Sequence, residues 1–123
     1  MSAFAFAAVS TEKLKFLFEM LCIAQCHALD RNEITEYNKR YDEIKAIEKE
    51  LKSRVGDQRR VLLEFFVHEN MQVRLTAARA TLAIDPVAAR LQLEAIRDSR
   101  WQPQAGDAGM ALYAIDDGIY KPT

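Results

Sequence analysis

The sequence predicts an all-α fold of about six helices, and three observations support this prediction. The 123 residues include only four glycines and three prolines, which leaves little room for the many tight turns of an all-β protein. Apolar residues recur three or four positions apart along most of the chain, as they do on one face of a helix. Residues that favour helix starts, such as Ser10 and Asn70, and glycines that favour helix ends, such as Gly56, stand at the borders of these segments.

The first part of the chain is predicted to be a helical hairpin over residues 11–55. Ser10 can cap a helix that runs to about Leu29. Its inward stripe is predicted to be Leu14, Leu17, Leu21, Ala24 and Ala28. A second helix, from about Glu33 to Val55, carries one narrow apolar seam and is otherwise charged. We expect this helix to cover a core on one side and to face solvent on the others; a dimeric coiled coil is the alternative.

The stretch from Met71 to Asp85 is predicted to be the central helix. Asn70 can cap its start, and the Asp85-Pro86 pair marks its end. Its apolar residues form two stripes, so the helix has to be covered on two sides. Three further helices are predicted at Gln58 to about Val67, at Pro86 to about Arg97, and from Pro103 to Asp117. Together they make two helix pairs over residues 57–118 of a single domain.

An internal repeat relates the last two pairs. At an offset of 31 residues, Thr76–Asp85 (TAARATLAID) lies over Asp107–Asp116 (DAGMALYAID), and five of the ten positions are identical. Each copy follows another predicted helix. A period of this size with two helices per unit is typical of an α-solenoid, in which small residues let neighbouring helices approach closely. Chance similarity between two alanine-rich helices is the alternative, and it would give a six-helix bundle without superhelical twist.

Two resemblances point the same way. Asn70–Arg74 (NMQVR), followed by Ala77-Ala78 and Leu82, resembles the second helix of a HEAT-type repeat. That resemblance implies an ion pair from Arg74 to Asp85 or Asp107. Further characteristic pieces are Tyr37-Asn38, residues 56–60 (GDQRR) and residues 103–110 (PQAGDAGM). On these pieces, a larger part of the chain resembles a bacterial family described as domain of unknown function number 2019. This family implies an α–α superhelix and brings no activity with it.

Charge and composition limit the cell compartment and the kinds of partner that we expect for this protein. Seventeen basic and eighteen acidic side chains nearly cancel, giving a net charge of −1, which argues against whole-protein binding to nucleic acid or to an anionic membrane. The longest apolar block, residues 16–24, is interrupted by Glu19 and is too short to cross a bilayer. Cys22 and Cys26 are four residues apart on one helix, a spacing that favours free thiols in a reducing cytoplasm.

Catalytic motifs are not evident. Neither His27 nor His68 stands beside a nucleophile in a turn of the kind that hydrolases use, and Cys22 and Cys26 lack the further ligands of a recognised zinc pattern. Gly106–Gly109 (GDAG) has no preceding strand and no following Lys-Ser/Thr, so it is a very weak phosphate signal. We therefore expect no enzyme activity, no cofactor and no metal. A polar small-ligand pocket near Asp107 and Tyr113 is the enzymatic alternative.

The sequence instead favours a protein-interaction module with an unknown partner. Between Ser53 and Tyr120 there is no lysine but many arginines, whose forked donors bind carboxylates, phosphates and aromatic rings. Intramolecular ion pairs are the simpler explanation, and binding to a nucleic-acid backbone is the alternative function. Trp101 is expected to wedge into the edge of the core, with an exposed contact residue as the alternative. Asp107 is expected to act as a cap or as an acceptor for Arg74, with a ligand contact as the alternative. The predicted partner-binding residues are Arg59, Arg74, Arg79, Trp101, Asp107 and Tyr113. An immunity-type protein and a homodimer are two specific versions of this hypothesis.

Overall fold

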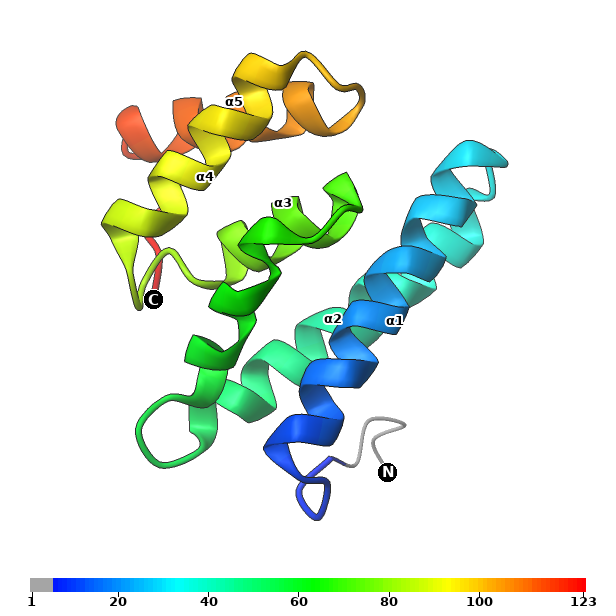
Figure 1. Cartoon of the computed structure of the whole chain (residues 1–123), viewed down its shortest axis with the longest axis vertical. Helices are drawn as coiled ribbons and strands as arrows, with labels where there is room; N and C mark the ends of the chain where they lie inside the picture. Colours follow the sequence, from blue (N-terminus) through cyan, green and yellow to red (C-terminus); the bar gives the residue numbers. More distant parts are fainter. Residues whose placement is uncertain (1–5) are drawn as a thin grey trace. The chain divides into compact units, whose positions relative to one another are not determined.

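The computed structural model describes residues 6–123, and in this range the regular secondary structure is helical, with no strands (Figure 1). The helices are α1 (Thr11–Asp30), α2 (Ile34–Ser53), η1 (Gln58–Val67), α3 (Met71–Ala80), α4 (Pro86–Ser99) and α5 (Gln104–Asp116). The predicted all-α class and the six predicted segments are confirmed. The chain divides into two compact units, one ending at Val61 and the other beginning at Leu62, so each unit is described separately.

The first unit is the predicted hairpin of α1 and α2. Ser10 caps α1 by accepting a hydrogen bond from the backbone N–H of Lys13 at 3.1 Å. The turn to α2 uses Asn32 in the left-handed region (φ 56°), a conformation that asparagine tolerates better than most residues. The backbone N–H of Glu33 then bonds to the carbonyl of Ala28 at 2.9 Å, which fixes the turn against the end of α1.

The buried stripe of α1 differs from the prediction. The buried residues are Leu14, Phe18, Cys22, Gln25 and Ala28, whereas Leu17, Leu21 and Ala24 are only half-buried. The reason is that α1 is apolar around most of its circumference, with Phe16 and Met20 exposed as well. Helical spacing alone therefore allowed several orientations of this helix.

The second helix buries few residues, as expected for a helix that faces solvent on most sides. Only Ile44, Ile47 and Leu51 of α2 are buried, while Ile34 and Tyr41 are exposed. Ion pairs also join neighbouring turns of α2, such as the one between the partly buried Arg40 and Glu43 at 3.0 Å. These pairs support the helix without a large core contact.

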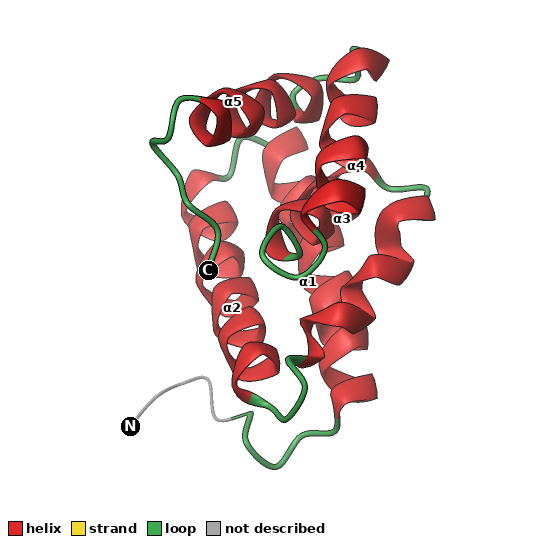
Figure 2. Ribbon diagram, turned by 90° about the vertical axis from the view of Figure 1, so that its left-hand side faces the viewer, coloured by secondary structure: helices red, strands yellow, loops and turns green. Residues whose placement is uncertain are grey.

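In the second unit, α3, α4 and α5 pack around one apolar cluster. Its buried members are Leu75, Ala78, Leu82, Ala89, Leu93, Ile96, Ala108 and Leu112. In Figure 2, α5 crosses α4. The two helices run in opposite directions, because Arg90 near the start of α4 bonds to Asp116 at the end of α5, whereas Arg97 near the end of α4 lies over Gly109.

The central helix is shorter than predicted. It ends at Ala80 rather than at Asp85, and Thr81 donates its hydroxyl to the carbonyl of Ala77 at 2.8 Å. The chain leaves the helix because Asp85 caps α4, accepting from the N–H of Ala88 at 3.1 Å in a non-helical conformation. The prediction that α3 is covered on more than one side is confirmed, since Gln72, Val73, Leu75, Ala77, Ala78 and Ala80 are all buried.

Residues related by the 31-residue offset are buried alike, but their helices do not end at equivalent positions. Ala77 and Ala108 are both fully buried, and Leu112 is buried at the position equivalent to Thr81. However, α5 continues to Asp116 whereas α3 has ended, and the equivalent Asp85 is a helix cap. The helix before α3 is also a 3-10 helix, whereas the helix before α5 is an α-helix. The two copies therefore share their buried small residues and differ in how their helices end.

Candidate functional site

The six predicted partner-binding residues fall into two groups. Arg59 and Arg74 are engaged within the protein, whereas Arg79, Trp101, Asp107 and Tyr113 are exposed. Arg59 is buried and forks onto the carboxylate of Asp57, with Nε and Nη2 at 2.9 and 2.7 Å from its two oxygens. This hydrogen bonding lowers the pKa of Asp57. Arg59 therefore fixes the turn before η1.

Arg74 bonds to a residue other than those predicted. When the Gln92 amide is oriented with its oxygen toward the guanidinium, that oxygen accepts from Nε and Nη2 of Arg74 at 2.9 and 3.0 Å. Among the described residues, Arg74 forms no ion pair with Asp85 or Asp107, the pairs that the HEAT resemblance implied. Asp85 caps α4 instead. Arg74 thus joins α3 to α4, and its donors face the inside of the unit.

Asp107 and Arg79 form a weakly coupled pair at the surface. Asp107 lies in the first turn of α5, and partial burial of its carboxyl raises its pKa. The positive charge of Arg79 acts in the opposite direction without cancelling this effect. Asp107 is therefore not the acceptor for Arg74 that the sequence suggested, and its exposed carboxylate is accessible from solvent.

Trp101 is exposed, so the prediction that it wedges into the core edge is wrong. Its side chain is 64% exposed, in the short loop between α4 and α5. The loop is fixed by other contacts: the carbonyl of Trp101 accepts from the N–H of Ala105 at 2.8 Å, and the side chain of Gln102 caps the N–H of Gly106 at 3.0 Å. Because these bonds position the backbone, the indole ring is not needed to close the loop.

Trp101 belongs to a larger set of exposed apolar side chains on the α4–α5 hairpin. We call this set the outer hairpin face; its members are Val87, Leu91, Trp101, Met110 and Tyr113, each at least 60% exposed. Val87 and Leu91 are one turn apart on the side of α4 opposite its buried stripe, and Met110 and Tyr113 are about one turn apart on α5. Only Trp101 and Tyr113 were predicted. Val87 and Leu91 could have been found as a second apolar stripe at i, i+4.

Ion pairs run along the same hairpin. Arg90 donates to both carboxylate oxygens of Asp116 at 2.8 and 3.0 Å and to Glu94 at 3.2 Å. The hydrogen bonds from Arg90 lower the pKa of Asp116. Arg97 pairs with Asp98 at 2.9 Å. These charges are largely neutralised within the chain. The exposed apolar side chains of the outer hairpin face are therefore the part of the hairpin surface whose contact with water is least favourable.

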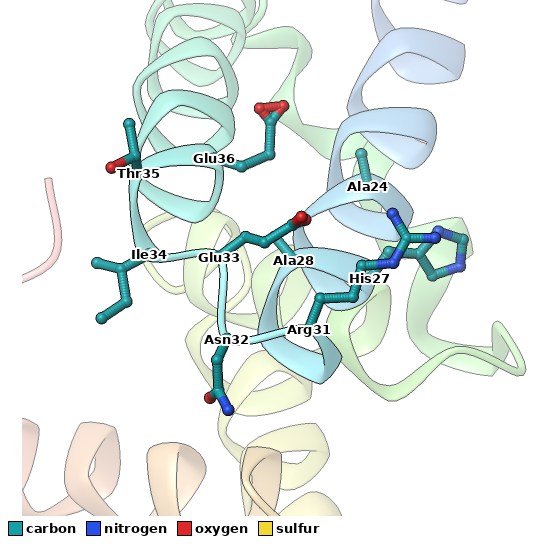
Figure 3. Close-up of a pocket in the computed structure, with 9 residues that line it drawn as sticks. All are labelled: Ala24, His27, Ala28, Arg31, Asn32, Glu33, Ile34, Thr35 and Glu36. Atoms are coloured by element: carbon teal, nitrogen blue, oxygen red, sulfur yellow. The ribbon is translucent and has the colours of Figure 1, made fainter.

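A cavity of about 730 Å³ lies in the first unit, at the turn between α1 and α2. Figure 3 shows His27 and Arg31 on the α1 side and Thr35 and Glu36 on the α2 side. The cavity also borders the start of α2, where Glu33 provides no side-chain cap. Its lining mixes basic and acidic groups. No nucleophile in the lining is hydrogen-bonded to a base, so it has no recognisable catalytic arrangement.

Two absences among the described residues bear on other functions. Within residues 6–123, no cluster of three or more histidine, cysteine or carboxylate side chains is placed to hold a metal ion. In the same range, every helix is too short or too polar to cross a bilayer. Cys22 is buried and Cys26 half-buried, and neither forms a disulfide bond.

Comparison with known proteins identifies the family. The pattern that defines the family described as "Domain of unknown function (DUF2019)" matches residues 12–116, which is most of the chain. The chain belongs to this family. The resemblance of the sequence to this family is thereby confirmed. This DUF2019 protein is also similar to the crystal structure of the protein RPA1889 from Rhodopseudomonas palustris CGA009. The two are 49% identical with a TM-score of 0.94, over 96% of this chain and 98% of the other. No curated protein matches the sequence.

Proposed function

We propose that this DUF2019 protein is a non-catalytic helical interaction module that binds a protein partner through its outer hairpin face. The observation that carries the proposal is the set of five large apolar side chains held out of the core on one helical hairpin. Large apolar side chains that a fold leaves in water mark protein-binding surfaces where they adjoin one another. Trp101 and Tyr113 are residue types that often contribute strongly to binding energy.

The use of the arginines supports a protein partner over a nucleic-acid backbone. Binding to phosphates requires cationic donors that face solvent. Here Arg59 and Arg74 direct their forks to internal acceptors, and Arg90 and Arg97 are paired with carboxylates. Each of these arginines would have to give up its present partner before it could hold a phosphate.

The fold that would present this face is a short HEAT-like stack. Supporting features are the contacts of α3 with both α4 and α5, and the buried Ala77 and Ala108 at equivalent positions of the repeat. The buried Gln104 amide also donates to Gln72 Oε1 at 2.9 Å, which joins the starts of α5 and α3. In such a stack the outward helices provide a rigid surface for a partner.

The experiment compares the wild-type chain with two variants as baits in native cell extract. Leu91→Asp puts a charge in the middle of the outer hairpin face, and Val55→Asp puts one at an exposed apolar residue of the other unit. We expect Val55→Asp to retain the co-purifying proteins and Leu91→Asp to lose them. Each lost protein is then purified and titrated against the three chains.

Two outcomes would overturn the proposal. One is equal affinity of the purified partner for the wild-type and Leu91→Asp chains. The other is binding of the wild-type chain to a fluorescent DNA or RNA duplex with an affinity that falls steeply with added salt, because this would show that phosphate contacts dominate.

A further inference from the structure

We infer that η1 is a hinge in which the middle of the segment converts between a 3-10 helix and an α-helix. The inference does not depend on the proposed function, because no residue of the outer hairpin face takes part in it. Three features of η1 support it: its length and position, the spacing of its apolar residues, and the contacts that hold its two halves.

The 3-10 form of η1 is unusually long. It extends over ten residues, Gln58–Val67, whereas 3-10 runs beyond three or four residues are uncommon because their hydrogen bonds are less well aligned. The segment contains neither glycine nor proline, so every residue in it can adopt an α-helix. The boundary between the two compact units falls inside it, after Val61. Long 3-10 stretches often mark hinges, and few contacts cross the boundary between compact units.

The apolar residues of η1 have the spacing of an α-helix. Successive residues turn by about 120° in a 3-10 helix and by about 100° in an α-helix. In the observed form the buried residues recur at every third position, at Arg59, Leu62 and Phe65. Phe66 therefore lies about 120° from this buried line, and in an α-helix it would lie about 40° from Leu62. Phe66 is instead half-buried against the apolar cluster of the second unit. The observed form thus divides between two sides what an α-helix would place on one.

Contacts at its two ends hold η1 in the 3-10 form. At the start, the buried Arg59 is forked onto the carboxylate of Asp57, within the first unit. At the end, the rings of Phe65 and His68 meet edge to face with their centroids 6.0 Å apart, since residues three apart share one side of a 3-10 helix. Nδ1 of His68 also accepts from the N–H of Asn70, the cap of α3, at 2.9 Å. Each half of η1 is therefore anchored within its own unit.

The stretch between these anchors, residues 60–64, can convert without losing hydrogen bonds. Each N–H exchanges the carbonyl three residues back for the carbonyl four residues back. Each converted residue shortens the segment by about 0.5 Å and turns it by about 20°. Conversion of four residues therefore changes the spacing of the flanking chain by about 2 Å and its rotation by about 80°. Binding to one unit that favours either form of η1 would be felt in the other unit.

The test is NMR spectroscopy of the isotope-labelled full chain. In the wild type we expect contacts in η1 between each Hα and the amide proton two residues later, as in a 3-10 helix. We also expect microsecond-to-millisecond exchange, measured by relaxation dispersion, at the amides of residues 60–66 and not in the middle of α1 or α4.

Two variants weaken one anchor each. Asp57→Asn lowers the charge of the acceptor for Arg59 and keeps a residue type that tolerates the left-handed backbone at this position (φ 51°). His68→Phe keeps the aromatic ring and removes the Nδ1 acceptor. Each should raise the α-helical population about three- to ten-fold, the effect of one lost hydrogen bond. The double variant should show contacts from Hα to the amide proton four residues later.

Val67→Thr is the matched control, because this side chain is exposed and threonine keeps its branched shape. It should leave the exchange unchanged, and unchanged chemical shifts in α1 and α4 will show that each variant keeps the fold. Absence of exchange at residues 60–66 of the wild type would overturn the inference, whether or not the variants fold. An α-helical contact pattern in the wild type would overturn it as well. An equal rise in exchange with Val67→Thr would show that the two anchors do not hold the 3-10 form.

Discussion

Replacing Arg54 should release the segment that precedes α1. Arg54 follows α2, and its guanidinium donates to the carbonyls of Phe6 and Val9, to the hydroxyl of Thr11 and to the carboxylate of Glu50. One side chain therefore ties the start of the described chain to the end of the second helix. We expect Arg54→Ala to lower the free energy of unfolding and to expose the segment before Thr11.

The expected loss of stability follows from the hydrogen bonds that Arg54 makes and from how exposed they are to water. A single intramolecular hydrogen bond contributes about 0.5–1.5 kcal/mol net, and more when one partner is charged. The Arg54 side chain is only 19% exposed, so its four bonds are partly shielded from water. The carbonyls of Phe6 and Val9 can regain water if the segment frays, which limits the total. We expect a loss of about 1–3 kcal/mol for Arg54→Ala. Arg54→Lys should lose less, since it retains the charge near Glu50 but lacks the fork.

The two effects are measured by urea denaturation and by amide hydrogen exchange. Exchange at Val9 and Lys13 should accelerate in Arg54→Ala, because their N–H groups bond to Phe6 and Ser10 in the same segment. Exchange in α4 and α5 should not change. If Arg54→Ala unfolds at the wild-type urea concentration and Val9 stays equally protected, the network contributes no stability and the reasoning is wrong.

Three further predictions concern the second unit. Leu93→Ala should lower the free energy of unfolding by about 2–5 kcal/mol in urea denaturation, because Leu93 is fully buried in the apolar cluster. Gln104→Leu should cost about 1–3 kcal/mol, since it removes the donor to Gln72 Oε1; a double-mutant cycle with Gln72→Leu should show strong coupling. The carboxyls of Asp107 and Asp116 should act with opposite signs in melting curves at pH 7 and pH 2. The lowered pKa of Asp116 stabilises the fold above its ordinary value of about 3.9, and this contribution is lost in acid, so Asp116→Asn should destabilise only at pH 7. The raised pKa of Asp107 means that its ionised carboxylate disfavours the folded state at pH 7, and protonation in acid removes this penalty, so Asp107→Asn should stabilise at pH 7 and lose its effect in acid.

Helix starts were predicted well because their signals are local. Ser10 and Asn70 each cap a helix through a bond to a backbone N–H within three residues, and Pro86 opens α4, so these signals need no knowledge of the rest of the fold. The end of α3 was missed because it depends on competing requirements. Leu82 and Ile84 continue the apolar spacing of the central helix, and only the cap that Asp85 provides for the next helix shows that the chain must leave α3 after Ala80.

The candidate surface was predicted only in part, because exposure depends on which of two apolar stripes faces the core. In α4 the stripe of Ala89, Leu93 and Ile96 is buried, and the stripe of Val87 and Leu91 is exposed. Both have helical spacing, so the sequence marks both as apolar without ranking them. Arg59 and Arg74 were placed on the surface for a related reason. Their partners Asp57 and Gln92 become evident only when turns and neighbouring helices are in place.

The contrast between arginine and lysine has a structural explanation. Arg54, Arg59, Arg74 and Arg90 each direct two or more guanidinium nitrogens to acceptors, which a single ammonium group cannot do in the same planar geometry. These four forks lie at turns or between helices, where a planar donor fixes two backbones at once. The absence of lysine between Ser53 and Tyr120 therefore fits structural use of arginine and does not require a phosphate ligand. Arg100 is an exception, since its exposed side chain forms no ion pair within the described residues. It stands beside Trp101 in the loop between α4 and α5, where its guanidinium is accessible from solvent.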